Sequence, residues 1–190
     1  VDADGRVLPP GEIGELETVM VGDLNVALLP KKNRAETVNV VIRPRWGDER
    51  SLQGKAVISS LAEAMVPRGA GKLSRQQIAD EMTRLKMQGS LRSFQTDRAN
   101  LAESLKLSAQ VMREASFPAD EFAQLKLETI TGLQAQLSDP EARSRDALAR
   151  HFDTYPVGDP RAYIPLEERI RLVEAASLED VKKFHADFWG

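Results

Sequence analysis

The spacing of apolar residues changes near residue 51, and this change constrains the fold more than any other feature of the chain. Before it, apolar residues recur at every second position in two stretches, at Leu24, Val26 and Leu28 and at Val38, Val40 and Ile42. That period is typical of half-buried strands. The stretch between them, KKNRAE, is polar turn material. These stretches predict two antiparallel strands joined as a hairpin.

After residue 51 the apolar residues recur at helical spacing. Val57, Leu61, Ala64 and Met65 form one stripe that ends near PRGAG, residues 67–71. Ser74 and Gln77 form a capping box at the start of a second helix, which continues through Ile78, Met82 and Leu85. We therefore expect two helices after the strands.

The second half of the chain reads as mostly helical. A weak strand signal lies at residues 89–97, around Leu91 and Ser93. Two apolar stripes predict helices, one through Leu101, Leu105, Ser108 and Met112 and one, after Pro118, through Phe122, Ile130, Leu133 and Leu137. Asp139 and Pro140 are expected to begin a third helix. A proline-rich loop at 154–165 is followed by a helix at 166–175 and by a last helix capped by Ser177 and Asp180.

This order of elements predicts an α+β domain in which helices cover an antiparallel or mixed sheet. We expect one shared core that contains Val38, Val40, Ile42, Leu61, Met65, Ile78 and Leu85. Residues 1–23 are rich in proline and glycine and begin without methionine, so they are predicted to be a linker from a preceding domain, with the domain itself at 24–190.

Charge and composition exclude several classes of function. The 26 Lys and Arg are balanced by 29 Asp and Glu, which argues against a nucleic-acid partner. No apolar run approaches the roughly 18 residues of a membrane span. Because the chain has no cysteine, disulfides and thiolate chemistry are excluded, although this says nothing about the compartment.

A family resemblance rests on an ordered series of short motifs. The stretch SSLAEAMVPRG (59–69) lies on the predicted first helix after LNVALLPKKNRAETVNVVIRPRWGDE, and FPADEF, LSDPEARSRDAL, YPVGDPR and SLEDVKKFHADFWG follow in order. This series resembles the insulinase or pitrilysin family of zinc metallopeptidases, whose inverted motif H-x-x-E-H lies on a helix after two strands. The resemblance covers nearly the whole chain from about Leu24.

The zinc ligands of that family are replaced here. The resemblance places Ser60 and Ala64 where the two histidines would be, Glu63 at the catalytic glutamate, and about Gly132 at the third ligand, with Glu128 a full turn away. A catalytic zinc needs three protein ligands and a water. The resemblance therefore implies no zinc, no cofactor and no catalysis in this chain, with Glu63 solvated or ion-paired.

Other candidate residues favour packing or surface roles. Ser60 would need a positioned base to act as a nucleophile, and no base is identifiable nearby. His151, near a helix end, and His185, in the last helix, are expected to be structural or surface residues. Trp46 and Trp189 are expected to pack, and the basic PKKNR stretch is expected to be a solvated hairpin tip.

Three interpretations of function remain open. By resemblance, the chain looks like the first domain of the inactive half of such a peptidase, which would enclose peptide substrate beside a zinc-bearing half in the same chain or in a partner subunit. The first alternative is a zinc-less scaffolding subunit of a larger assembly. The second is that the domain is itself a peptidase, which would need a metal site that the sequence does not show.

Overall fold

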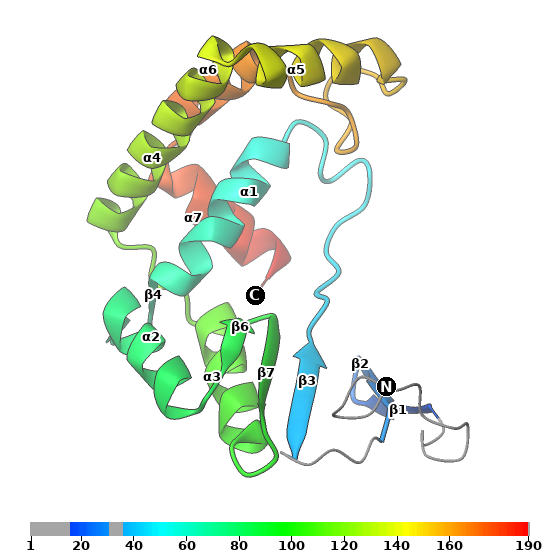
Figure 1. Cartoon of the computed structure of the whole chain (residues 1–190), viewed down its shortest axis with the longest axis vertical. Coiled ribbons are helices and arrows are strands. Elements are labelled where there is room, and N and C mark those ends of the chain that lie inside the picture. Colours follow the sequence, from blue (N-terminus) through cyan, green and yellow to red (C-terminus); the bar gives the residue numbers. More distant parts are fainter. Residues whose placement is uncertain (1–15, 31–35, 190) are drawn as a thin grey trace.

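The computed structural model describes residues 16–30 and 36–189, and its elements follow an arc (Figure 1). The strands are β1 (Glu17–Val21), β2 (Leu24–Leu28), β3 (Thr37–Val41), β4 (Gly69–Ala70), β5 (Leu73–Ser74), β6 (Gln88–Ser90) and β7 (Ser93–Asp97). The helices are α1 (Ala56–Met65), η2 (a 3-10 turn, Val66–Arg68), α2 (Arg75–Arg84), α3 (Leu101–Arg113), α4 (Ala119–Ser138), α5 (Pro140–Phe152), α6 (Leu166–Ala175) and α7 (Leu178–Phe188). The predicted α+β class with an antiparallel sheet is confirmed.

The strand pairing differs from the predicted hairpin. Among the described residues β2 pairs with β1, while β3 pairs with β7 in the antiparallel order β3-β7-β6. Strand β1 lies in the segment predicted to be a linker, and the two residues Gly22 and Asp23 connect it to β2. Gly22 has a φ of 58°, a conformation that glycine adopts without strain. Because only two residues connect the strands, pairing β2 with β1 costs less chain entropy than pairing β2 with β3 across a longer loop. Residues 1–15 of the predicted linker lie outside the described residues.

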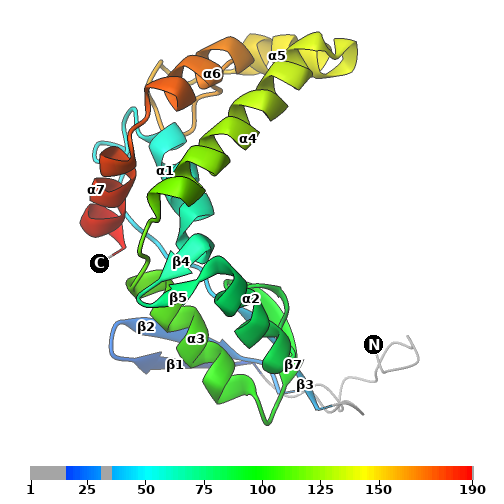
Figure 2. The ribbon, with the colours of Figure 1, turned by 90° about the vertical axis from the view of Figure 1, so that its left-hand side faces the viewer.

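The predicted single core is two clusters. Leu61 and Met65 lie in a cluster formed by α1, α4, α6 and α7, whereas Ile78 and Leu85 lie in a second cluster beneath the sheet. Figure 2 shows α2 and α3 together on one side of β3 and β7. The expectation of one core was wrong because η2 turns the chain directly after α1, so the stripe of α1 and the stripe of α2 face different partners. Val38 and Val40 in β3 and Ile42 just after it are half-buried, and Val40 and Ile42 pack against the second cluster.

The helix ends agree with the capping signals in the sequence. Ser74 and Gln77 form the predicted capping box of α2, and Ser177 and Asp180 form that of α7. The Asp139 side chain accepts hydrogen bonds from the first backbone N–H groups of α5. Local side-chain chemistry therefore sets these boundaries.

The buried face of α3 is rotated from the predicted stripe. Leu105 is 40% exposed, whereas Leu107 and Val111 are buried together with Ser104 and Ser108. Ser108 belongs to the predicted stripe, but Ser104, which does not, is buried where Leu105 was expected. Serine is small enough to let this face of the helix approach the sheet. The prediction for Leu105 was wrong for this reason.

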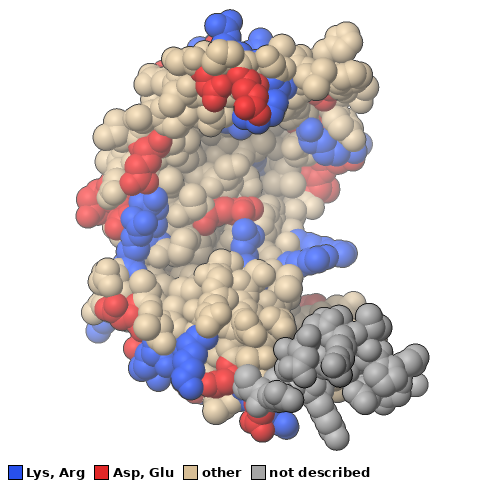
Figure 3. Space-filling model, viewed as in Figure 1, with Lys and Arg blue, Asp and Glu red and all other residues tan. Residues whose placement is uncertain are grey.

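The surface and the helix lengths limit what the described part of the chain can contact. Figure 3 shows acidic and basic side chains interspersed on one face, without a large area of a single sign. None of the helices in residues 16–30 and 36–189 is long and apolar enough to cross a bilayer.

Candidate functional site

The positions that the motif assigns to histidines lie on α1, but neither can hold a metal. Ser60 is exposed, and its hydroxyl donates a 3.0 Å hydrogen bond to the backbone oxygen of Ala56 one turn earlier. Ala64 is half-buried and packs against the first core cluster. The Ser60 hydroxyl thus has a backbone partner, and no side chain of the described residues bonds to it as a base.

Glu63, at the position of the catalytic glutamate, is paired with an arginine. Its carboxylate lies 2.9 Å from Nη2 of Arg92, in the turn between β6 and β7, and both side chains are about one-third exposed, at 33% and 38%. The Arg92 guanidinium also lies 5.8 Å from the ring centroid of Trp189. Glu63 therefore connects α1 to the sheet.

The third motif position, Gly132, is exposed on α4, and apart from the adjacent residues and the backbone of α4 no described atom lies within 4 Å of the place a Cβ would occupy. Glu128, one turn earlier, accepts a 2.8 Å hydrogen bond from Gln124 and a 3.1 Å hydrogen bond from Arg68. These two bonds, that of Gln124 above all, hold the pKa of Glu128 below its usual range. Glu128 is thus an ionised partner of Arg68.

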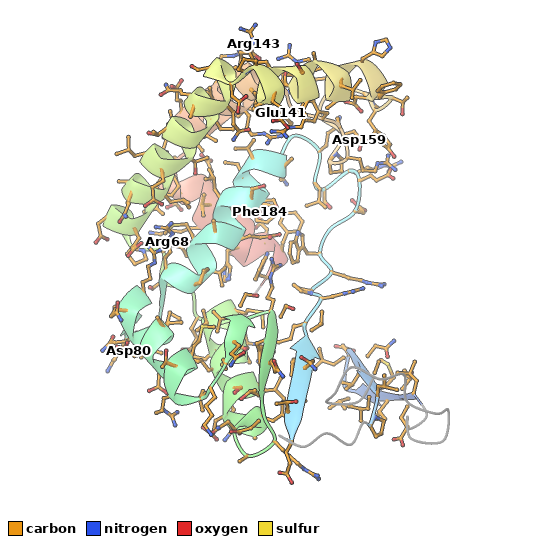
Figure 4. The ribbon with its side chains drawn as sticks, in the orientation of Figure 1. Arg68, Asp80, Glu141, Arg143, Asp159 and Phe184 are labelled. Carbon is orange, nitrogen blue, oxygen red and sulfur yellow. The ribbon has the colours of Figure 1, made fainter. Side chains whose placement is uncertain are left out.

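Arg68 carries a buried charge beside Glu128, and no pattern in the sequence predicts its role. It sits in η2 where α1 ends, between the first turns of α4 and α2 (Figure 4). One guanidinium nitrogen lies 2.9 Å from Glu121 and another 3.1 Å from Glu128, while Arg75 lies 3.4 Å from Glu121. The seven-residue spacing of Glu121 and Glu128 puts both on one face of α4, but nothing local pointed to an arginine more than 50 residues earlier.

Replacing Arg68 by methionine is expected to lower the free energy of unfolding by about 1–3 kcal/mol, because two charge-assisted hydrogen bonds are lost and Glu121, only 20% exposed, keeps only the distal Arg75. Urea unfolding followed by circular dichroism measures the change. Arg143→Met is the matched control, because Arg143 is exposed and has no ion pair in the described part of the chain. Equal unfolding midpoints for the two variants would contradict the role given to Arg68.

The two histidines differ in environment, since His185 is buried and His151 is exposed. His185 is buried, and its Nε2 lies 2.9 Å from the backbone oxygen of Met112. Its ring stacks on Trp189 at 5.7 Å, and Trp189 contacts Trp46 at 4.7 Å. His151 is exposed at the end of α5. Of the basic hairpin tip, residues 31–34 lie outside the described residues.

Metal ligands do not gather anywhere in the structure's described ranges, 16–30 and 36–189: no group of three or more His, Asp or Glu side chains is arranged to hold an ion. The motif positions supply a hydroxyl, a methyl group and a hydrogen atom, and Glu63 and Glu128 each have an arginine partner. What the arrangement does is join α1 to the sheet and η2 to α4 through ion pairs.

The architecture matches solved structures of proteases. The peptidase M16 inactive domain from Pseudomonas fluorescens aligns with 90% of this chain at a TM-score of 0.68 and 18% identity. The fold is that of an M16 peptidase domain. A protease from Helicobacter pylori aligns with this chain over 90% of its length, at a TM-score of 0.68 and 21% identity. The periplasmic protease PqqL from Escherichia coli does so over 90%, at a TM-score of 0.58 and 13% identity.

The likeness to M16 domains lies in the fold. No protein-family model matches the sequence, and no curated protein matches it. The chain spans 43%, 43% and 20% of the three solved proteins, so it corresponds to less than half of each.

Proposed function

We propose that this chain is a non-catalytic domain of an M16-type peptidase, which helps to enclose a peptide substrate and supports a zinc-bearing half. The observation that carries the proposal is the alignment of 90% of the chain with a solved structure described as a peptidase M16 inactive domain. The zinc-bearing half would lie in the same chain or in a partner subunit.

The side chains at the motif positions support the non-catalytic assignment. A hydrolytic zinc is held by three imidazole, carboxylate or thiolate ligands and keeps an open position for water. Ser60, Ala64 and Gly132 offer none of these ligand groups. The residues present do not fit a zinc ion, so no step of peptide hydrolysis is assigned to this chain.

The ion pairs support a scaffolding role. In an active M16-type site the glutamate on α1 would act on a metal-bound water. Here Glu63 forms an ion pair with Arg92 and Glu128 forms one with Arg68. The first pair links α1 to the sheet, and the second links η2 to α4. A wall of a substrate chamber needs this kind of rigidity rather than reactivity.

The purified chain is expected to retain no stoichiometric zinc after dialysis and to cleave no member of a broad peptide library. The reason is that losing even one ligand of a three-ligand site usually weakens metal binding severely. Elemental analysis measures the zinc, and Glu63→Gln serves as the matched variant with no expected effect on either readout. Stoichiometric zinc, or cleavage that Glu63→Gln abolishes, would show that the domain is itself a peptidase.

Isolation of the native protein from its source tests the supporting role. Mass spectrometry should find an H-x-x-E-H motif either in the same polypeptide or in a subunit that co-purifies with it, and the assembly should cleave peptides. A stable native assembly without any such motif would favour the zinc-less scaffolding subunit instead.

A further inference from the structure

A cavity of about 390 Å³ lies between the start of α1, the end of α6 and one side of α7. Its walls are mainly apolar and include Val57, Ile58, Leu172, Phe184 and Phe188. Figure 4 shows Phe184 between α1 and α7. Ligand pockets in proteins typically have about 300–1,000 Å³ and apolar walls with a few placed polar groups. This cavity is large enough for one or two apolar side chains.

Four charged side chains also line the cavity, and three of them have partners on α7 or at its start. Lys183 lies 3.2 Å from Asp187. Asp180 accepts hydrogen bonds from the backbone N–H and the hydroxyl of Ser177 in the capping box of α7. Both acidic groups of the lining are therefore engaged within α7 and its cap.

The fourth charge, Lys55, has no carboxylate partner within salt-bridge distance in the described part of the chain. Its Nζ donates a 2.7 Å hydrogen bond to the backbone oxygen of Ser51 and lies 4.9 Å from the ring centroid of Phe188. Ser51 is itself held by reciprocal hydrogen bonds with Asp48, both 2.8 Å long. The ammonium group is thus fixed against an aromatic wall of the cavity, with capacity for further acceptors.

We propose that this cavity binds a short apolar carboxylate, with the apolar part between Ile58, Phe184 and Phe188 and the carboxylate on Lys55. A charge-assisted hydrogen bond to an ammonium that is partly removed from water is stronger than a neutral one. The chemistry fits the last residue of a peptide that ends in leucine or phenylalanine, and it equally fits a free short-chain fatty acid. The site is separate from the motif positions and does not depend on the proposed function.

Titration of the ¹⁵N-labelled chain by NMR tests the proposal with three probes: N-acetyl-leucine, its uncharged amide, and octanoate. The carboxylates are expected to shift backbone amides of residues 54–58 and 172–188 selectively. The amide of N-acetyl-leucine is expected to bind about tenfold more weakly, because it lacks the charge that Lys55 recognises. Binding of N-acetyl-leucine alone assigns the peptide end, and binding of octanoate alone assigns the fatty acid.

Lys55→Gln should remove the preference for the carboxylate over the amide, while Lys182→Gln, at an exposed lysine of α7 that does not line the cavity, should keep it. Circular dichroism checks that both variants are folded. The proposal is overturned if no probe shifts these amides at millimolar concentration, if N-acetyl-leucine and its amide bind equally, or if Lys55→Gln keeps the tenfold preference.

Discussion

Replacing Leu61 by alanine is expected to lower the free energy of unfolding by about 2–5 kcal/mol. Leu61 is only 4% exposed and lies in the cluster that joins α1 to α4 and α7. The substitution loses the transfer free energy of the removed methyl groups and also leaves a cavity, because the surrounding helices relax only in part to fill it. Urea unfolding followed by circular dichroism gives the change.

Leu127→Ala is the matched control for this prediction. Leu127 is 67% exposed on α4, so the same atoms are removed without opening a cavity, and the expected change is within about 0.5 kcal/mol. A loss of less than 1 kcal/mol for Leu61→Ala would mean that the α1 stripe does not carry the first cluster.

Replacing Asp146 by alanine is expected to cost about 2–4 kcal/mol, because several donors lose one acceptor. Asp146 is buried in α5, and its carboxylate accepts a 2.8 Å hydrogen bond from the Tyr163 hydroxyl and a 3.0 Å hydrogen bond from the Leu166 N–H. Arg150 lies 2.8 Å from the other carboxylate oxygen. The residue therefore caps α6 from another helix and anchors the loop before it.

The contribution of Asp146 should also depend on pH. Burial acts to raise the pKa of Asp146, but the bonds from Tyr163 and Leu166 and the charge of Arg150 outweigh it, so the pKa lies below the ordinary 3.8. Since the pKa is lower in the folded state, the stabilisation is present above pH 3.8 and is lost as the pH falls below it. The stability difference between the wild type and Asp146→Asn should therefore shrink in acid.

Glu141→Ala, in the same helix, is the control. Glu141 is 77% exposed and, among the described residues, forms an ion pair only with Arg145, which is 68% exposed, so the expected cost is at most about 1 kcal/mol. If Asp146→Ala cost no more than Glu141→Ala, the capping of α6 by Asp146 would be structurally unimportant.

The sequence by itself determined the helices and most of their boundaries. The capping residues Ser74, Asp139 and Ser177 bond to backbone groups two or three residues away, and an apolar stripe joins positions three or four apart. Such contacts form wherever the local pattern exists, so they can be read without knowing the rest of the molecule. The ordered motifs likewise predicted the fold that this chain shares with a solved peptidase M16 inactive domain, and they placed Ser60, Glu63 and Ala64 on α1.

Only the tertiary structure decided which elements meet. Strand β3 joins β7 rather than β2, and the core divides at η2. Arg68 reaches Glu121 across 53 residues, and Lys126 donates to the last carbonyl groups around α6 from 48 and 50 residues away. The free energy of such pairings depends on how all elements pack together and on the desolvation of each charge. The sequence around a β-strand or a single arginine therefore does not predict its partner. The pairing of Glu63 with Arg92, which gives that glutamate a structural partner, belongs to this second kind.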